Sequence, residues 1–443
     1  MTSQEQKFSQ IDEVSSCFCI AKWLQVTIDL VHGTNHSCHH PKRHKIPLDQ
    51  LAKDPSALHN TLFKKQQRKI MLEGTRPPEC SYCWTVEDTE GRGISDRYIK
   101  STDPWAYPHL EKVKQLAWKE NINPTYVEVM FDKVCNLACS YCLADISSSI
   151  ANEMRKFGPY PVHNKSHRDF QETAAELVGE VNPYVEAFWK WFPEILEDLE
   201  VFRITGGEPL LNSNTFKVID YLGSSVSKKL TLAVNSNLCL EDHLIKKFTK
   251  GVNQLLVEGR IKDFELYASV DTYGQQAEYI RNGLDYSQFI KNVEYFCSEA
   301  PSSRVVMMCT YSVLSIPGFD KLLKELSELK KKYSNLILDI SFLRHPEYLR
   351  ANMVTPDLVT KIAGDIELMK ELATFSEYEI GKLTRIYDWV SAGATKDQNN
   401  LYRMDFYSFV NEYDRRKGTN FLESFPELGE FYTVCRKTKM LLG

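Results

Sequence analysis

The chain has 443 residues, of which 43% are hydrophobic and 26% charged, with 20 Gly and 18 Pro. This ordinary globular composition excludes collagen-like, mucin-like and largely disordered proteins, and the length suggests two or three domains. The 54 basic and 59 acidic side chains give a formal net charge of −5. A general electrostatic attraction to nucleic acid is therefore not expected, although this balance leaves room for a local basic patch.

Neither a membrane span nor a secretion signal is visible in the sequence. No stretch approaches the roughly 18 consecutive apolar residues of a transmembrane helix. The N-terminal sequence MTSQEQK has no apolar core and no cleavage-like site. We therefore expect a cytoplasmic protein. In a reducing cytosol its 12 cysteines are expected to bind metal or to take part in catalysis, not to form structural disulfides.

From about Thr125 onward, short β-branched or aromatic runs alternate with longer amphipathic stretches. The predicted strands are 126–131, 201–205, 230–234, 264–270, 304–311 and 336–342, and helix-like patterns lie at 214–221, 240–247 and 321–331. After a longer first interval, the strands start roughly 30 to 40 residues apart, which is the span of a right-handed βαβ unit. The pattern predicts an α/β fold with a parallel, curved sheet and helices outside, and sites at the carboxyl ends of strands.

Three regions can be distinguished along the chain. Residues 1–100 contain cysteines, histidines and turn residues but little βα periodicity, and residues 123–349 carry the repeated units. Residues 350–443 are helical in pattern and highly charged. Within the first interval, 146–181 is predicted to be an inserted loop or partly mobile lid, followed by a helix over 185–199. We predict one domain for each of the three regions.

A compact cysteine motif follows the first predicted strand. Cys135, Cys139 and Cys142 have the spacing Cys-x3-Cys-x2-Cys. Three thiolates so close together can hold one iron–sulfur cluster, because soft sulfur ligands suit iron. Three ligands in place of four leave one iron open to a substrate or cofactor. A zinc knuckle, the alternative, needs a fourth ligand, and none follows at a suitable spacing.

This motif resembles that of the radical S-adenosylmethionine (radical SAM) superfamily, over about 126–348. The resemblance implies that the three cysteines hold a 4Fe-4S cluster whose open iron chelates the amino and carboxylate groups of SAM. It further implies reductive cleavage of SAM to a 5′-deoxyadenosyl radical that abstracts hydrogen from a substrate. Tyr141 matches the aromatic position whose backbone lies near the adenine.

Further motifs fit the same family. Gly206, Gly207, Glu208 and Pro209 end the second predicted strand and match the element that engages the SAM amino group, although a simple glycine turn is the alternative. Asn235 ends the third strand, where the family has polar groups near the SAM ribose. Ser269 lies at the end of the fourth predicted strand, and Arg281 follows that strand.

The family pattern places Ser269 and Arg281 at the SAM carboxylate. Arginine offers bidentate recognition of a carboxylate, which lysine does not. The alternative for Arg281 is a charge on a surface helix.

A second set of cysteines lies near the N-terminus. Cys19, Gly33 and Cys38 have the spacing Cys-x13-Gly-x4-Cys, and Cys80 and Cys83 follow much later. Four thiolates suit a structural zinc or a fully ligated iron–sulfur cluster equally well. The glycine is expected to mark a hairpin turn that returns Cys38 beside a strand formed by residues 22–30.

The spacing resembles the twitch domain, a shortened relative of the SPASM domain, and the resemblance implies an auxiliary 4Fe-4S cluster held by these four cysteines. In most relatives this domain follows the barrel, whereas here it precedes it. Cys17 is an alternative to Cys19 as a ligand, and zinc is an alternative to the cluster. His36, His39 and His40, beside Cys38, are conceivable ligands.

Two isolated cysteines are weaker catalytic candidates. Cys309 lies in the fifth predicted strand, and Cys239 lies just beyond the third. Some radical SAM epimerases use a barrel cysteine to return a hydrogen atom to the product radical. The alternative is that each is an inert, buried small hydrophobe.

Together these motifs predict a partial (β/α)6 radical SAM barrel preceded by a small Cys-rich, twitch-like domain. The resemblance implies a radical SAM enzyme of oxidoreductase or epimerase type, a ribosomally made peptide as substrate, and a reductant such as flavodoxin or ferredoxin as partner. Radical oxidation or epimerisation of a sugar, aminoglycoside or nucleotide is the alternative activity. A zinc-stabilised interaction protein is the non-enzymatic alternative. Neither a membrane nor nucleic acid is an expected partner.

Overall fold

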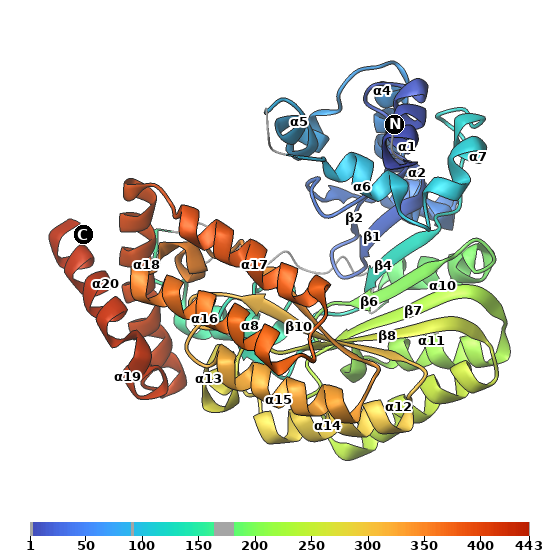
Figure 1. Ribbon diagram of the computed structural model, residues 1–443. Helices are drawn as coiled ribbons and strands as arrows, with labels where there is room; N and C mark the ends of the chain where they lie inside the picture. Colours follow the sequence, from blue (N-terminus) through green and yellow to red (C-terminus); the bar gives the residue numbers. More distant parts are fainter. Residues whose placement is uncertain (1–2, 90–92, 164–180, 443) are drawn as a thin grey trace.

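The computed structural model describes residues 3–89, 93–163 and 181–442. They form a mixed α/β protein built around a largely parallel sheet (Figure 1). Within these ranges, nine strands form one sheet in the order β11-β10-β8-β7-β6-β4-β1-β2-β3. The strands from β11 to β1 run parallel, and β2 and β3 are antiparallel to their neighbours.

The strands have the following bounds: β1 (Gln25–Asp29), β2 (Thr34–His36), β3 (His44–Lys45), β4 (Tyr126–Met130), β6 (Val201–Thr205), β7 (Ser227–Ser236), β8 (Ile261–Ser269), β10 (Arg304–Tyr311) and β11 (Leu336–Phe342). Two short strands, β5 (Ala138–Cys139) and β9 (Arg281–Asn282), pair separately. All six strands predicted from the sequence are present. β7 and β8 begin three residues earlier than predicted, at positions where polar residues weaken the sequence pattern.

Helices alternate with the parallel strands. Those that follow β4 are α8 (Ser148–Phe157), α10 (Pro183–Ile195), α11 (Ser213–Ser224), α12 (Asp242–Val257), α13 (Gly274–Ile280), α14 (Tyr286–Glu299) and α15 (Phe319–Lys332). Figure 1 shows α11, α12, α14 and α15 along the outer side of the sheet. The strand side chains that alternate toward the helices, such as Val127, Val129, Phe202 and Ile204, are buried and form the core.

The inserted segment after β4 contains the helix α8, where the sequence predicts a loop or lid. The capping residue Ser147 accepts a hydrogen bond from the backbone N–H of Ile150 at 3.4 Å and so begins this helix. The rest of the predicted insertion, 164–180, lies outside the described residues.

The N-terminal region is mainly helical, with α1 (Ser3–Val14), α2 (Ala21–Leu24), α3 (Leu48–Lys53), α4 (Leu62–Leu72), α5 (Ser81–Glu87), α6 (Asp96–Thr102) and α7 (Leu110–Lys114). The expected strand over 22–30 is wrong in its first part, because residues 21–24 form α2. The strand β1 pairs in parallel with β4, so the large sheet continues across the predicted domain boundary. The division of the chain into domains stays a prediction.

The predicted hairpin turn lies between β1 and β2. Gly33 has φ +60°, and a Cβ atom there would overlap the ring of Tyr184, so the turn requires glycine twice over. The strands β1 and β2 pair antiparallel with Thr27 opposite His36. This turn returns the chain to Cys38, which lies two residues after the end of β2.

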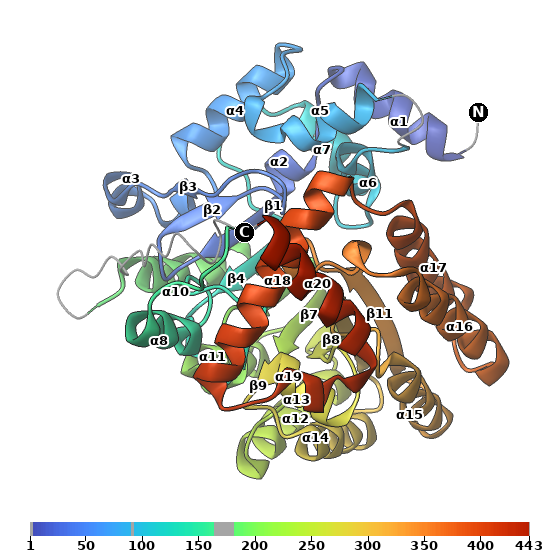
Figure 2. The same ribbon diagram turned by 90° about the vertical axis from the view of Figure 1, so that its left-hand side faces the viewer.

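The chain ends in a helical layer: α16 (Pro356–Leu372), α17 (Glu377–Ala392), α18 (Lys396–Lys417), α19 (Phe421–Ser424) and α20 (Gly429–Leu442). Figure 2 shows α18 to α20 together with α13 in front of the strands. The Tyr413 hydroxyl donates to the Tyr279 carbonyl at 2.8 Å, which joins α18 to α13. In the described residues, no helix combines the length and apolarity that a membrane crossing requires.

Candidate functional site

The three central cysteines meet at one cavity beyond the carboxyl end of β4. Cys135, Cys139 and Cys142 all line this cavity, whose volume is about 220 Å³. No fourth cysteine of the described chain lines it. Burial raises the pKa of the Cys135 thiol to about 11 and raises that of Cys142 further. Binding of a metal at these thiols therefore releases protons.

The start of α8 holds the loop that carries Cys135. The backbone N–H of Cys135 donates to Ser148 Oγ at 3.1 Å, and Ser149 Oγ donates to the Cys135 carbonyl at 2.6 Å. The backbone N–H of Ser148 donates in turn to the Lys133 carbonyl at 2.7 Å. These bonds fix the loop through its backbone, and Cys135 lines the cavity.

The two glycines after β6 bring backbone against this loop. Gly206 has φ +125°, and its position would place a Cβ atom 2.6 Å from the Asp132 carbonyl oxygen. The backbone N–H of Gly207 donates to the same carbonyl at 3.2 Å, and that of Glu208 donates to the Val134 carbonyl at 2.7 Å. Both glycines line the cavity, so their lack of side chains opens it.

Glu208 is placed differently from the glycines. Its buried carboxylate does not line the cavity and accepts hydrogen bonds from Ser236 Oγ at 2.8 Å and from the backbone N–H groups of Leu210 and Asn237 at 3.0 and 2.7 Å. Burial raises its pKa to about 7 despite these donors. The Glu208 side chain therefore holds the end of β7. The family resemblance, by contrast, implies that the element with Glu208 contacts a cofactor.

The end of β7 supplies polar groups to the cavity. The predicted residue Asn235 lines it, together with Ser236 and Asn237, the two polar residues that follow it in the same strand-end motif. The lining residues to which the sequence motifs assign no role are Leu137, Ile146, Ser147, Thr205, Met308 and Thr310. Thr205 and Thr310 lie at inward positions near the carboxyl ends of β6 and β10, so the strand alternation itself contains the signal for them.

The remaining predicted cofactor residues, Ser269, Arg281 and Tyr141, also line the cavity. Arg281 is buried, and its Nε lies 2.8 Å from Asp271 Oδ2. Its Nη2 donates to the Tyr141 hydroxyl at 2.6 Å, and that hydroxyl donates to Asp271 at 2.9 Å. Burial lowers the pKa of Arg281, but the charge of Asp271 outweighs this and leaves it raised. Arg281 is therefore a buried, positioned cation, and the surface-charge alternative is wrong.

The two weaker catalytic candidates lie elsewhere. Cys309 is fully buried, and its thiol donates to the Asp271 carbonyl at 3.5 Å. Cys239 Sγ accepts a hydrogen bond from the Asp285 backbone N–H at 3.3 Å. Among the described residues that line the cavity, neither cysteine occurs. This placement gives no support to a catalytic role for either thiol.

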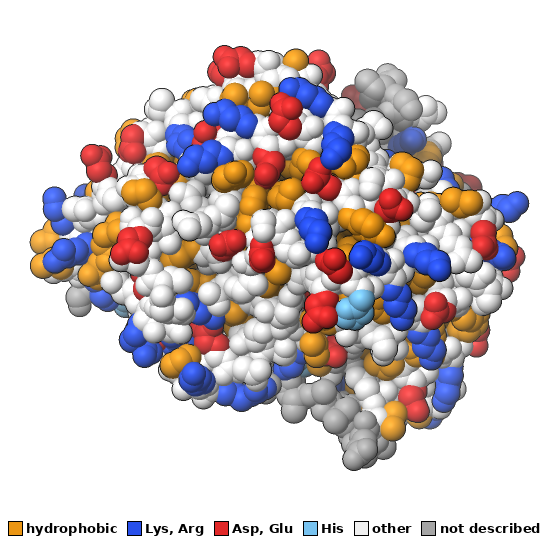
Figure 3. Space-filling view, turned by 90° about the horizontal axis from the view of Figure 1, so that it is seen from below, with side chains coloured by type: hydrophobic (Ala, Val, Ile, Leu, Met, Phe, Trp, Pro, Cys, Tyr) orange, Lys and Arg blue, Asp and Glu red, His pale blue; other side chains and the backbone are white. Residues whose placement is uncertain are grey.

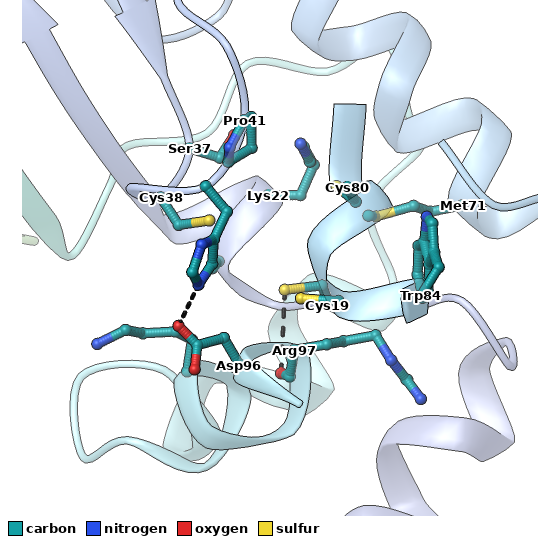
Figure 4. A pocket seen from close by; sticks show the side chains of 14 residues that line it. Cys19, Lys22, Ser37, Cys38, Pro41, Met71, Cys80, Trp84, Asp96 and Arg97 are labelled. Atoms are coloured by element: carbon teal, nitrogen blue, oxygen red, sulfur yellow. Dashed lines mark hydrogen bonds and ion pairs between the residues drawn. The ribbon is translucent and has the colours of Figure 1, made fainter. Parts of the chain in front are cut away.

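The four N-terminal cysteines meet around a second, small pocket of about 20 Å³ (Figure 4). Cys19 precedes α2, Cys38 follows β2, and Cys80 and Cys83 lie at the start of α5. Cys19 Sγ lies 4.0 Å from the Arg97 carbonyl oxygen. Burial raises the pKa of the Cys80 thiol to about 11 and those of Cys38 and Cys83 to about 12. The meeting of these four residues from three separate segments is the donor set expected for a fully ligated metal centre.

A buried ammonium group accompanies these thiols. Lys22 lines the pocket, is almost fully buried and forms an ion pair with Glu79. Burial lowers its pKa, but the neighbouring Cys80 and Glu79 outweigh that effect and leave the pKa raised. A buried cation requires negative charge around it, and thiolates at this pocket would supply such charge.

The alternative ligands are placed less favourably. The Cys17 thiol donates to the Gly74 carbonyl at 3.4 Å and does not line the four-cysteine pocket. His40 does line it, but its Nε2 lies 2.6 Å from Asp96 Oδ2 and its ring stacks on Tyr82 at 3.6 Å. Asp96 thus already binds His40. As a ligand at the four-cysteine pocket, Cys19 is better placed than Cys17.

The chain matches no protein-family model and no curated protein. Among solved structures, it is similar to anSMEcpe with bound AdoMet, at 16% identity over 55% of this chain and 59% of that chain, with a TM-score of 0.35. Streptococcus suis SuiB bound to S-adenosylmethionine is 12% identical over 80% of this chain and 70% of its own, with a TM-score of 0.37. TYW1 with a bound lysine–pyruvate adduct is 15% identical over 55% of this chain and 70% of its own, with a TM-score of 0.28. The chain thus spans less than two thirds of the first structure, and such TM-scores do not establish a shared fold.

Proposed function

We propose that this chain is a radical SAM enzyme. The observation that supports the proposal is the convergence of one cysteine motif and several strand-end residues on a single cavity. Cys135, Cys139 and Cys142 lie there with Gly206 and Gly207 and with the residues Asn235, Ser269, Arg281 and Tyr141. These come from five segments spread over residues 135–281. They meet at the carboxyl ends of parallel strands, which is where an α/β enzyme of this kind has its active site.

The residues present fit the cofactors that this function needs. Three thiols without a fourth match a 4Fe-4S cluster with one open iron, and in our proposal Cys135, Cys139 and Cys142 hold it. When bound, the cluster supplies the electron that cleaves SAM to methionine and a 5′-deoxyadenosyl radical, which abstracts hydrogen from the substrate. In this proposal the six parallel strands from β4 to β11 are a partial (β/α)6 barrel.

The chain's own residues prepare the SAM position. The glycines present backbone groups to the cavity, and Arg281 offers a fixed guanidinium to a carboxylate. Asp271 and the Tyr141 hydroxyl hold that guanidinium, so little side-chain entropy is lost when a ligand binds. Glu208 fixes the end of β7, which keeps Asn235 at the cavity wall.

We further propose that the N-terminal region is a twitch-like domain with an auxiliary 4Fe-4S cluster. The support is the pocket lined by Cys19, Cys38, Cys80 and Cys83, which offers four thiols and leaves no coordination position open. The buried Lys22 ammonium beside this pocket suits an anionic centre. An additional redox centre favours an oxidoreductase over an epimerase, and the substrate in this proposal is a ribosomally made peptide.

The proposal is tested by SAM cleavage in anaerobically reconstituted protein. With dithionite, or with flavodoxin or ferredoxin as the reductant, the protein should form 5′-deoxyadenosine and methionine. Replacing Cys135, Cys139 and Cys142 by Ala should abolish this reaction. Cys435→Ala, which changes a buried cysteine of α20, is the matched control and should retain it. Undiminished cleavage by the triple variant would refute the assignment.

A further inference from the structure

A third cavity, of about 700 Å³, lies between the two cysteine sites. It shares Thr205 and Gly206 with the cavity of the central cysteines. It shares Pro41 and Lys100 with the pocket of the four N-terminal cysteines. Pockets for small ligands have volumes of roughly 300–1,000 Å³. This cavity is therefore large enough for a bound molecule that reaches from one cysteine site to the other.

The floor of the cavity is a polar face of the sheet. Thr27 on β1, Glu128 on β4 and Arg203 on β6 are neighbours in register, and all three line the cavity. The residues that alternate with them, such as Val127 and Phe202, are fully buried in the core. The same strands thus carry a packed apolar face and a polar face that borders open space, as a binding surface does.

The described lining of this cavity carries more positive than negative charge. It contains four cationic side chains, Lys42, Arg43, Lys100 and Arg203, and two carboxylates, Asp29 and Glu128. This excess is local, because the whole chain has a net charge of −5. On the helical underside of the molecule, by contrast, acidic and basic side chains are interspersed (Figure 3).

One of the two carboxylates is already neutralised by the protein. Asp29 Oδ2 lies 2.8 Å from Arg43 Nη1 and 2.7 Å from His32 Nδ1, and Asp29 Oδ1 accepts the backbone N–H of Val31 at 3.0 Å. Asp29 and Arg43 therefore neutralise each other's charge. Among the charged residues of the described lining, this leaves Lys42, Lys100 and Arg203 with Glu128 as the remaining carboxylate.

The three remaining cations are held to different degrees. Arg203 is fixed in the floor, where its Nε donates to Asn235 Oδ1 at 2.8 Å and its guanidinium lies 3.9 Å from the Tyr267 ring centre. Lys42 is exposed at the rim. Lys100 lies 3.6 Å from Asp103, and this partly exposed pair is weak. A ligand that brings negative charge can therefore engage one fixed arginine and two more weakly held lysines of the lining.

We propose that this cavity binds the substrate peptide through an acidic side chain, with Lys42, Lys100 and Arg203 as its countercharges. The inference rests on the proposed function, because it takes the peptide as the substrate of that site. A segment of several residues fits the volume, and an Asp or Glu in it provides the carboxylate that the cations recognise. Neighbouring residues of the peptide then lie toward Gly206 and the central cysteine cavity.

Affinity selection from a synthetic peptide library tests this proposal. Reconstituted wild-type protein with SAM is incubated with random ten-residue peptides, and the retained peptides are sequenced by mass spectrometry. We expect peptides with Asp or Glu to be enriched roughly tenfold over matched Asn or Gln peptides, the factor that one modest charged contact provides. Raising the salt concentration should reduce this preference, because charges near the surface are screened.

Charge reversal locates the preference in the cavity. Lys42→Glu with Lys100→Glu should remove the enrichment of acidic peptides. Lys228→Glu with Lys229→Glu is the matched control, since these exposed lysines lie at the opposite, amino-terminal end of β7. It should select the same peptides as the wild type. If the double rim variant proves unstable in a thermal melt, Lys42→Glu alone repeats the test, because that side chain is exposed.

Failure of this inference is distinguishable from failure of the proposed function. Wild-type protein without acidic preference, without any retained peptide, or with a preference that the rim variants keep, would overturn the acidic-peptide assignment. Cleavage of SAM by the wild-type protein in the absence of peptide is a separate measurement. If the wild-type protein does not cleave SAM, the proposed function is refuted, whatever peptides are retained.

Discussion

The carbonyl oxygen of Val134 lies 2.2 Å from the point that a Cβ atom on Gly207 would occupy. The end of β6 and the cysteine loop therefore meet backbone to backbone, at a distance that no other residue type allows. The hydrogen bond from Glu208 N–H to the Val134 carbonyl, at 2.7 Å, holds the same contact. One glycine thus sets the position of the loop that carries Cys135.

Gly207→Ala should displace this loop, because the added methyl group collides with backbone and not with a side chain that can rotate. We expect a loss of about 1–3 kcal/mol in the free energy of unfolding and reduced iron binding at the central cysteines. The measurements are urea unfolding and iron content after reconstitution. Gly223→Ala in α11 is the control. Apart from its chain neighbours and the backbone of its own helix, no described atom lies within 4 Å of the point that its Cβ atom would occupy, and helix propensity favours Ala. Equal iron content in both variants would contradict the prediction.

The choice between Cys17 and Cys19 as a ligand can be tested with the central site removed. In a background with Cys135, Cys139 and Cys142 replaced by Ala, about four irons should remain if the N-terminal set holds a 4Fe-4S cluster. Cys19→Ala should lower that iron content and change the cluster absorption. Cys17→Ala should leave both unchanged, because its thiol faces the Gly74 carbonyl.

Metal analysis of the same background also decides the identity of this centre. One zinc per chain and no iron would replace the auxiliary cluster with a structural metal site. The four-cysteine geometry would then stand, whereas the redox role would fall. Iron that is retained after Cys19→Ala but lost after Cys17→Ala would instead contradict the placement of the two thiols.

The six strands from β4 to β11 were predictable because each combines β-branched or aromatic residues with regular spacing. The strand β1 was only partly so. Residues 22–24 are as apolar as the strand that follows, yet they form α2, in which Trp23 and Leu24 pack into a separate hydrophobic cluster. The pairing of β1 with β4 joins segments about 100 residues apart, and no local pattern encodes such a pairing.

The site was predictable where short spacing carries the chemistry. Their spacing identifies Cys135, Cys139 and Cys142 as site residues, and their position after a strand identifies Gly206 and Gly207. The role of each residue within the site was not predictable from the sequence. Glu208 lies beside cavity residues in sequence but points to the β7 end, and the pairing of Arg281 with Asp271 depends on the tertiary fold.

The buried pair of Arg281 and Asp271 leads to a third prediction. Arg281→Met should lower the free energy of unfolding by about 3–5 kcal/mol, because it leaves a fully buried carboxylate without its cation. Adding Asp271→Asn should recover part of this loss. A double-mutant cycle by urea unfolding measures the coupling, and a coupling near zero would show that the two charges do not stabilise each other.

Arg281→Lys keeps the charge but loses the planar group that reaches Asp271 and Tyr141 together. We expect weaker SAM binding by about 1.5–3 kcal/mol, the usual contribution of a hydrogen bond to a charged group. Calorimetry of reconstituted protein checks this value. Equal affinities of the wild type and the Lys variant would remove Arg281 from the SAM site.

The last prediction concerns pH and two buried carboxyl groups. Burial raises the pKa of Glu208 from 4.5 to about 7 and that of Asp365 from 3.8 to about 7. The folded chain therefore keeps protons that the unfolded chain releases above its lower pKa. The stability that each group contributes is present below the unfolded pKa and is lost as the pH rises toward 7. The loss is on the order of 3 kcal/mol for Glu208 and on the order of 4 kcal/mol for Asp365.

Urea unfolding of the metal-free protein between pH 5 and 8 measures this effect as a difference between variants. The comparison must be a difference, because burial lowers the pKa of His36 to about 4 and that of His44 to about 3, and these groups act with the opposite sign. Asp365→Asn and Glu208→Gln should each make the free energy of unfolding fall less steeply with pH than in the wild type. Glu367→Gln, an exposed change on the same helix as Asp365, should keep the wild-type slope. Parallel curves for all four proteins would show that neither buried carboxyl group retains its proton in the folded chain.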